Sequence, residues 1–590
     1  MWKTFKAIRG NRSFNTYFDK LKIHQLLSFG IIVLLVGIPT VVALKGYIFG
    51  ASGDQEQFMW QSKNFINIWV NGTTLVKDSG FGVEIPYAYT PLAIIQSFLY
   101  LTLKAVFTNT TLAVNLTTGI FLSLNYLSMY FYLKSLKLKP IVSTLGAVIF
   151  AFASQIIIHA NYHISLYIMF TIPLFFMFLK KAETSFSFKN LTILMLLLAT
   201  TFYIHEYHGL FLLITLIVWI CFNYRRFINR KNLVAFIKAS LIGIVSMSLF
   251  IKIYADKLFY DTANNISSLR IPEQTINYNA TLWDFLLPSN DNILFGNLAS
   301  QIYTNKSPIE RGLIEFPNYL GIVVLILLLI GIVLWYKKKI EVRNKTTLFY
   351  LLILLIAIVF SSGALYIGTN GTIRLPMFWG FNFNIPPINQ LRSFGRFGIY
   401  VAFIATTASM FILNYIFLNL KRNLARSVFP LIIVILAIFS ILDLYPESRI
   451  LYHKWPIGSF VDTIKNDNEF FYVLNLPFRI GQPDYGAYPL YLQTLHQKNI
   501  INNYTSFTSP LYLNKIKSSE VNCLYIDTII NRPCDKIDYT KLQDEKIKYV
   551  IITKNSIYEN DSNYKSIVNS LKEKFVIIYE SEDVVAIRTY

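Results

Sequence analysis

The sequence predicts an α-helical polytopic membrane protein that ends in a small α/β unit. Apolar stretches of about twenty residues, long enough to span a bilayer, alternate with short loops rich in lysine and arginine. Hydrophobic residues make up 54% of the 590 and charged residues only 15%, a composition typical of membrane proteins. Hydrophobicity falls sharply after Tyr445, where the α/β unit is expected to begin.

Basic clusters predict the orientation of the helices. Cytoplasmic loops collect Lys and Arg, so we expect the N-terminal segment and five later loops in the cytoplasm. Those loops begin at Lys134, Lys180, Arg225, Lys337 and Lys421. The net charge of +21 is concentrated there, where it orients helices and meets anionic lipid, so no nucleic-acid partner is needed. Each apolar block between neighbouring clusters must then cross the membrane twice.

This parity predicts eleven crossings of the plasma membrane. The apolar run 91–107 is interpreted as a helix in the outer interface, because counting it as a crossing would place Lys134 outside. An N-terminus in the cytoplasm then puts the C-terminus outside the cell. The membrane domain is residues 1–445, with outer loops 45–111, 255–317 and 367–396. The predicted spans are 26–44, 112–133, 141–158, 164–180, 191–205, 208–224, 233–254, 318–336, 347–366, 397–419 and 428–445.

Residues 446–590 are predicted to form the extracytoplasmic α/β unit. About 145 residues can bury a core of their own. Short β-branched and aromatic runs are typical of strands, and the last two are separated by a three-residue turn, which predicts a hairpin. The expected strands are Phe470–Leu476, Lys548–Thr553, Phe575–Glu580 and Val584–Thr589, and the expected helices are 456–468 and 562–574.

Two of the three cysteines, Cys523 and Cys534, lie in this unit. An oxidising exterior would permit a disulfide between them, and two free thiols are the alternative. Their spacing fits no metal motif.

Asp54 is the first candidate for chemistry, because it follows span 1 directly and precedes an amphipathic stretch suited to the membrane surface. A carboxylate held there could accept a proton from an acceptor hydroxyl. The alternative is that Asp54 caps the following helix. Glu56 and Glu84, in the same outer loop, are further candidates for the binding site.

Histidines at the outer ends of two spans are the second set of candidates. His159 and His163 are four residues apart and share one helix face, so they could bind one metal ion or substrate. His205, Glu206 and His208 cluster similarly, but the spacing does not match the His-Glu-x-x-His zinc motif. Ionisable groups at the edge of the bilayer are functional candidates. A role as ordinary interfacial histidines is the alternative.

Arginines before the tenth span form the third set. Arg392 and Arg396 are four residues apart on one predicted helix face, and paired guanidiniums suit a phosphate. Arg374 lies upstream in the same outer loop and is included as a phosphate ligand. The alternative is that the arginines reach toward lipid head groups.

Polar residues of the α/β unit are the fourth set. Tyr491, Gln493 and His496 are expected to contribute to the acceptor site, and a solvated helix or loop is the alternative.

Together these residues resemble the integral-membrane C-type glycosyltransferases, which include oligosaccharyltransferase catalytic subunits, protein O-mannosyltransferases and lipid A aminoarabinose transferase. The closer likeness is to bacterial multispanning proteins implicated in glycosylating cell-surface polymers. It is carried by short motifs: Gly53-Asp54, Pro91-Leu92, the His159–His163 and Arg392–Phe397 stretches, Leu476-Pro477, and Tyr491-x-Gln493-x-x-His496.

The resemblance implies a polyprenyl- or dolichyl-phosphate sugar as donor, Asp54 as catalytic base, and Arg392 and Arg396 as a phosphate clamp. The chain departs from the oligosaccharyltransferases, since it lacks their Trp-Trp-Asp motif and their acidic metal pair. We therefore expect a metal-independent enzyme without cofactor, and a divalent metal is the less favoured option. It would move a hexose or pentose by single displacement from a polyprenyl-phosphate donor to a cell-surface polymer, lipid or protein. The alternatives are a flippase for a lipid-linked glycan and a noncatalytic membrane scaffold.

Overall fold

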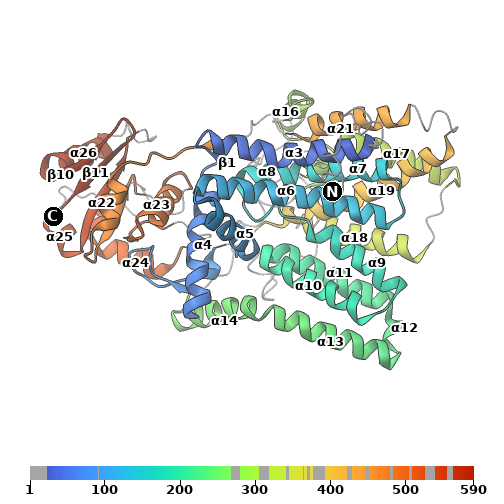
Figure 1. The fold of residues 1–590 in the computed structure, drawn as a ribbon, viewed down its shortest axis with the longest axis horizontal. Helices are drawn as coiled ribbons and strands as arrows, with labels where there is room; N and C mark the ends of the chain where they lie inside the picture. The colour runs from blue at the N-terminus through green and yellow to red at the C-terminus, as the bar shows by residue number, and fades with distance from the viewer. Residues whose placement is uncertain are drawn as a thin grey trace, which may run out of the picture.

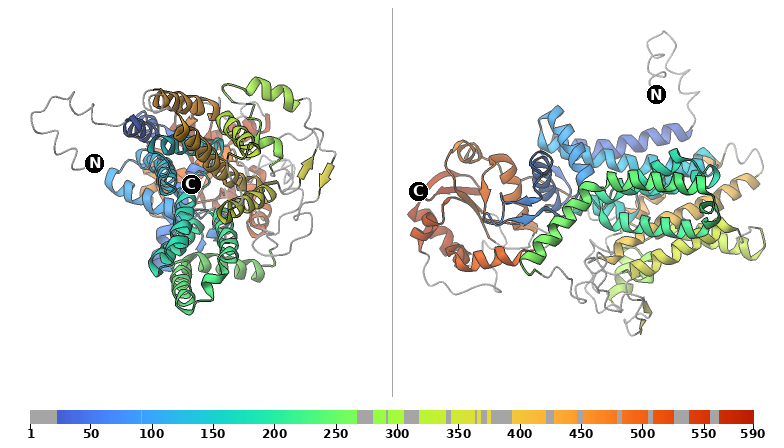
Figure 2. Two further views of the ribbon diagram at one scale, coloured as in Figure 1. Left: turned by 90° about the vertical axis from the view of Figure 1, so that its right-hand side faces the viewer. Right: turned by 90° about the horizontal axis from the view of Figure 1, so that it is seen from below.

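The computed structural model is a long helical bundle with a mixed β-sheet unit at one end (Figure 1). Helix α4 (Asp54–Asn71) lies between the two parts and runs across the direction of the bundle helices (Figure 1). The further views show the same division (Figure 2). The structure describes residues 23–90, 92–266, 280–290, 292–304, 318–339, 344–362, 365–367, 373–375, 393–420, 428–445, 451–478, 483–503, 508–524, 538–554 and 562–590.

Short polar side chains cap some of the bundle helices. Asn109 accepts a hydrogen bond from the backbone N–H of Leu112 (2.9 Å), and Ser187 accepts one from Asn190 (3.3 Å). Such caps satisfy N–H groups that a helix leaves unpaired. The helices are α3 (Ile23–Leu44), α5 (Ile94–Phe107), α6 (Thr110–Ser135), α7 (Pro140–Ala151), α8 (Ser154–Tyr162), α9 (Thr171–Thr184), α10 (Phe188–Ile204), α11 (Glu206–Phe222), α12 (Tyr224–Phe227), α13 (Arg230–Ser246), α14 (Ser248–Ala263), α16 (Gly296–Thr304), α17 (Ile322–Tyr336), α18 (Lys345–Ser362), α19 (Gly398–Asn419) and α21 (Phe429–Leu444).

The helices define a multi-pass membrane protein. By length and composition, four described segments can cross a membrane: α3, α6, α18 and the segment Phe394–Asn419. The number is up to six if the bent pairs α7–α8 and α13–α14 each form one span. Faces of α13, α17 and α18 leave apolar side chains exposed, which suits contact with lipid. Each of the eleven predicted spans overlaps at least one helix of the structure. The number of helices that cross the membrane remains a prediction.

Several basic clusters lie together at one end of the bundle. The Arg226 guanidinium donates to the carbonyl of Ala182 (3.5 Å), and the Lys345 ammonium donates to the Asn223 amide oxygen (3.0 Å). These contacts join the end of α9, the short helix α12 and the start of α18. Helix α12 lies at the end of the bundle away from the sheet unit (Figure 1).

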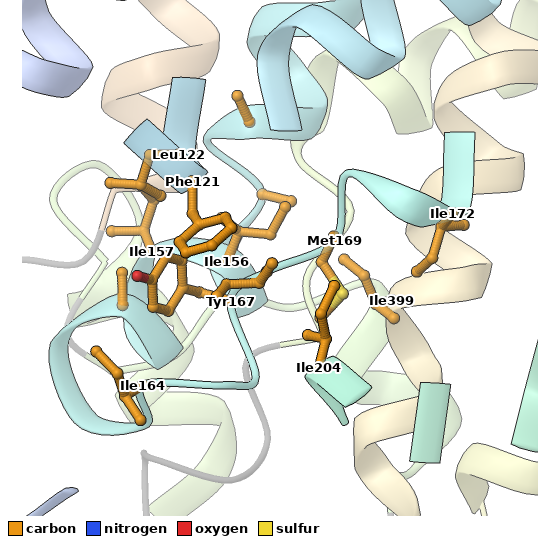
Figure 3. Close-up of a cluster of buried hydrophobic side chains, with 14 of the residues drawn as sticks. Phe121, Leu122, Ile156, Ile157, Ile164, Tyr167, Met169, Ile172, Ile204 and Ile399 are labelled. Carbon is orange, nitrogen blue, oxygen red and sulfur yellow. The ribbon is translucent and has the colours of Figure 1, made fainter. Parts of the chain in front are cut away.

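An irregular segment, residues 163–170, separates α8 from α9 inside the bundle. The Asn125 side chain of α6 satisfies its backbone, donating to the Tyr167 carbonyl (2.7 Å) and accepting from the Met169 N–H (2.8 Å). Buried nonhelical backbone needs such partners at membrane depth. Apolar side chains from α6, α8, α9, α10 and α19 pack around the segment, including Phe121 and Ile399 (Figure 3). This packing fixes His163 at the start of the segment.

The C-terminal unit contains a five-stranded sheet of order β10-β11-β9-β7-β8. Strand β7 is parallel to β8 and β9, whereas β11 is antiparallel to β9 and β10. The four predicted strands and the hairpin are present, and β8 is an additional edge strand. The elements are β7 (Tyr472–Leu476), β8 (Asn499–Ile500), β9 (Ile547–Thr553), β10 (Val576–Glu580), β11 (Val584–Arg588), α22 (Phe460–Asn466), α23 (Pro483–His496), α24 (Pro510–Ser518), α25 (Tyr539–Asp544) and α26 (Ser562–Lys574).

The loop between α3 and α6 joins the bundle to the sheet unit. Residues 78–81 extend the sheet beyond its edge strand β8, because the Phe81 N–H donates to the Ile500 carbonyl (3.2 Å) and the Ile500 N–H donates to the Asp78 carbonyl (3.0 Å). Helix α23 packs against α4. The short strands β1 (Ile48–Phe49) and β6 (Tyr452–His453) form a second, antiparallel connection.

Candidate functional site

The turn from Gly50 to Asp54 connects β1 to α4 and presents the predicted catalytic acid. Asp54 is the first residue of α4, and Gly53 precedes it with a φ of 136°, which an L side chain rarely adopts. The Ala51 N–H donates to the carbonyl of Asn161, at the end of α8 (2.6 Å). Helix α8 therefore holds the turn in place. His163, which caps the C-terminal end of α8, lies beside the turn.

Asp54 and His163 are hydrogen-bonded to each other at this junction. Asp54 Oδ2 lies 2.8 Å from His163 Nδ1, and the two side chains are only 16% and 20% exposed. The buried His159 ring lies beside His163, with 5.4 Å between ring centroids. The two histidines therefore lie side by side, and Asp54, which is far from them in the sequence, is bonded to one of them.

The second histidine cluster lies where α10 meets α11. His205 separates the two helices, and its ring centroid is 5.4 Å from that of His208 in the first turn of α11. Glu206 Oε2 is 3.8 Å from His205 Nδ1. The Arg396 guanidinium lies over the Tyr207 ring at 5.2 Å, a cation–π contact.

The two clusters and Arg396 converge on one site. His205 is close enough to interact electrostatically with His159, with His163 and with Arg396. Arg396 also interacts with Glu206 and His208. The carboxylate of Asp54 and a guanidinium more than 300 positions later are therefore linked through one group of histidines.

Arg396 belongs to a short 3-10 helix, η5 (Phe394–Phe397), that leads into α19. Ser393 has nonhelical dihedral angles, and its N–H donates to the Tyr207 hydroxyl (3.1 Å) instead of continuing a helix. Arg392 itself lies outside the described residues. Arg374 falls in strand β5 (Ile373–Leu375), and its side chain is also outside the described part.

The two candidate glutamates between α3 and α6, Glu56 and Glu84, have protein partners. The Glu56 side chain is fully buried and accepts hydrogen bonds from Gly53 and from two residues of the C-terminal unit, His453 and Trp455. The helix-capping role considered for Asp54 thus belongs to Glu56. Glu84 forms a partly exposed salt bridge with Lys77 (2.7 Å).

The polar residues predicted in the C-terminal unit lie on α23 and are buried. Gln493 donates to Asp78 Oδ2 (2.8 Å), and the same carboxylate accepts from Trp60 (3.1 Å) and Lys63 (3.2 Å) of α4. These contacts attach α23 to α4.

Burial shifts the pKa of two other side chains of α23, Tyr491 and His496. Burial raises the pKa of the Tyr491 phenol to about 12, with a further contribution from Glu56. Burial, together with Lys63 and Lys498, lowers the pKa of His496 to about 3. At neutral pH both side chains are therefore uncharged.

Among the described residues, no group of three or more His, Cys, Asp and Glu side chains is arranged to hold a metal ion. Metal independence remains a prediction. Cys523 is disulfide-bonded, Cys221 is a free cysteine, and Cys534 lies outside the described residues.

Sequence reasoning missed His453, Trp455 and Asp78. His453 and Trp455 closely follow the last apolar run. A histidine and a tryptophan just beyond a predicted span could have marked them as candidates. No local pattern marks Asp78, because its partners come from α4 and from Gln493, 415 positions later.

Comparison with solved structures places the fold in a known class. The arabinofuranosyltransferase AftD from mycobacteria is similar over 95% of this chain, with a TM-score of 0.57 and 12% identity, and this chain covers 40% of AftD. An oligosaccharyltransferase from Archaeoglobus fulgidus is similar over 90% of this chain and 68% of its own length, with a TM-score of 0.46 and 12% identity. ArnT from Cupriavidus metallidurans, bound to undecaprenyl phosphate, is similar over 95% of this chain and 98% of its own length, with a TM-score of 0.47 and 10% identity. The fold is that of the integral-membrane C-type glycosyltransferases.

The chain belongs to the family described as "Domain of unknown function (DUF6311)", whose model matches residues 91–444, more than half of the chain. The matched region includes both histidine clusters and Arg396, and it excludes Asp54 and the C-terminal unit. No curated protein matches the sequence.

Proposed function

We propose that this protein is a glycosyltransferase that moves a sugar from a polyprenyl-phosphate donor to a cell-surface acceptor. The observation that carries the proposal is the convergence of Asp54, the histidine clusters and Arg396 at the end of the bundle next to the sheet unit. The C-type fold, shared with an arabinofuranosyltransferase, supports the same class of reaction.

The proposed reaction is a single displacement. The acceptor hydroxyl oxygen attacks the anomeric carbon while the bond from that carbon to the phosphate oxygen breaks. Asp54 takes the hydroxyl proton, oriented by its pairing with His163. Arg396 stabilises the negative charge that develops on the departing polyprenyl phosphate. Arg392 and Arg374 are proposed as further phosphate ligands. The histidines and Glu206 would contact the sugar or the acceptor.

The proposed orientation places this end of the bundle outside the cell. Eleven crossings from a cytoplasmic N-terminus would put the first outer loop and the C-terminal unit on the same, outer side. Their direct contact through α4 and α23 supports that assignment. The enzyme is proposed to act without a metal ion.

Asp54→Asn in the full-length protein, expressed in a strain that lacks the native copy, tests the proposal. We expect loss of one sugar from cell-surface polymers and accumulation of its polyprenyl-phosphate donor, measured by sugar analysis and lipid mass spectrometry. Asp462→Asn, an exposed acid in α22, is the matched control and should behave as the wild type. Unchanged glycosylation would favour a scaffold. Donor retained only in the cytoplasmic leaflet would favour a flippase.

A further inference from the structure

The segment 451–455 of the C-terminal unit lies directly on the turn that presents Asp54. Strand β6 pairs antiparallel with β1, and the Gly50 N–H donates to the Leu451 carbonyl (2.7 Å). The Leu451 N–H in turn donates to Asn161 Oδ1 (3.2 Å). The C-terminal segment, the turn and the end of α8 are thus bonded to one another.

His453 contributes two hydrogen bonds to this contact. Its Nδ1 donates to the Gly50 carbonyl (2.8 Å), and its Nε2 bonds to Glu56 Oε1. A carbonyl and a carboxylate only accept, so both ring nitrogens carry protons and the ring is an imidazolium. The Glu56 side chain is fully buried and that of His453 is 16% exposed.

Glu56 is held from both sides of the contact. Its Oε1 also accepts from the Trp455 indole N–H (2.7 Å), and its Oε2 accepts from the Gly53 N–H (2.8 Å). Gly53 immediately precedes Asp54, so the carboxylate of Glu56 fixes the backbone from which the Asp54 side chain extends. A buried carboxylate needs such donors and a compensating charge.

We propose that His453, acting through Glu56, is a positioning residue that holds the Asp54 turn in its catalytic geometry. The C-terminal unit would thus complete the site. The catalytic part of the inference rests on the proposed function. In this proposal His453 acts through Glu56 and the turn.

The surroundings of the pair leave His453 as the group that balances Glu56. Trp455 does not titrate, and the pKa of Tyr491, which interacts with Glu56, is raised to about 12. Lys454 is exposed and its ammonium lies near Gly46. Burial alone would lower the pKa of His453. The hydrogen bond and the charge of Glu56, together with the hydrogen bond to the Gly50 carbonyl, outweigh burial and raise this pKa.

This linkage gives the contact a defined pH dependence. A raised pKa in the folded protein means that the stabilisation is fully present below about pH 6.5, the ordinary value for histidine. It is lost as the pH rises through the raised pKa, because the imidazolium then loses a proton and one hydrogen bond. The turn should therefore become less protected on the alkaline side.

Hydrogen exchange of the full-length protein in nanodiscs tests the proposal without any substrate. The amides of Gly50, Ala51 and Gly53 are hydrogen-bonded at the contact and report on it directly. In His453→Gln we expect their exchange to be about 10- to 100-fold faster, since a bond to a charged group is lost. Lys454→Ala is the matched control and should match the wild type, as should amides of β9 in all variants.

Two further variants separate positioning from general loss of structure. Trp455→Phe keeps an aromatic ring but removes the indole N–H that donates to Glu56. It should accelerate exchange of the turn amides less than His453→Gln does. Glu56→Gln combined with His453→Gln makes the pair neutral, and should restore part of the protection and abolish its decline at alkaline pH. Turn protection that is unchanged in His453→Gln, or that is independent of pH in the wild type, would overturn the proposal.

The sugar-incorporation assay then distinguishes the two levels of inference. If Asp54→Asn is inactive and His453→Gln loosens the turn, we expect His453→Gln to lower the rate with a steeper loss toward alkaline pH. A loosened turn with an active Asp54→Asn would reject the proposed function and leave the contact standing. A loosened turn with a wild-type rate and pH profile would reject the catalytic role of His453.

Discussion

Asp54 Oδ2 and His163 Nδ1, which are 109 positions apart, lie 2.8 Å from each other. This pairing joins the start of α4 to the end of α8. It also gives the acid a fixed orientation, because a carboxylate bonded to an imidazole cannot rotate freely. The pair faces the second histidine cluster, with which His163 interacts electrostatically.

His163→Gln should reduce the rate of sugar incorporation by about 10- to 100-fold, less than Asp54→Asn, for which removal of a general base predicts about 10²- to 10⁴-fold. Glutamine can still donate to Asp54 but holds it less rigidly. The measurement is the initial rate in membrane vesicles that contain endogenous donor. If the two variants lose equal activity, His163 has a direct chemical role as well as a positioning one.

Arg396→Gln should lower the rate by about 10²- to 10³-fold, because a charge that stabilises the leaving phosphate is removed. Arg396→Lys keeps the charge but loses the planar stacking on Tyr207, so we expect partial activity. The same vesicle assay measures both variants. Equal activity in the glutamine variant and the wild type would remove Arg396 from the proposed phosphate site.

Cysteine labelling should place the first outer loop outside the cell. In a Cys221→Ser background, Lys77→Cys should react with a membrane-impermeant maleimide in intact cells, since the Lys77 side chain is 65% exposed. Lys231→Cys, exposed at the basic end of the bundle, is the matched control and should react only after permeabilisation. The reverse pattern would put Asp54 in the cytoplasm and end the proposed mechanism.

His496 should make the protein less stable at acidic pH. Its lowered pKa of about 3 leaves the ring neutral in the folded protein, whereas histidine in an unfolded chain has a pKa of about 6.5. The unfolded state therefore binds one more proton between these values, which costs about 1.4 kcal/mol of stability for each pH unit below 6.5.

Thermal unfolding in detergent at pH 7.5 and pH 5 measures this effect. The melting temperature of the wild type should fall further than that of His496→Gln, which has no proton to bind. An identical decrease in both proteins would show that His496 is not the responsible group.

Local sequence patterns predicted much of the fold. Apolar stretches located the bundle helices, and β-branched runs located β7, β9, β10 and β11, because periodicity and side-chain shape act within a few residues. The strands β1, β6 and β8 carry no such signal. Each is two residues long and exists because a distant partner offers its backbone.

The sequence predicted the members of one shared site but not which of them pair. Asp54, His163 and Arg396 were singled out individually, yet nothing local assigns His163 to Asp54. The predicted pairing of Arg396 with Arg392 stays a prediction, because Arg392 lies outside the described residues. The polar face of α23 was expected to contact acceptor or solvent, and its Gln493 instead bonds to Asp78.

The sequence by itself determined a chain that must enter a membrane, and it determined which polar residues stand at the ends of the helices, since both follow from hydrophobicity read along the chain. Only the tertiary structure decided that Glu56 meets His453, 397 positions later, and that Asp54 meets His163. The physical reason is that a buried charge needs a partner but does not specify which one. That choice belongs to the packing of helices and strands that brings distant segments together.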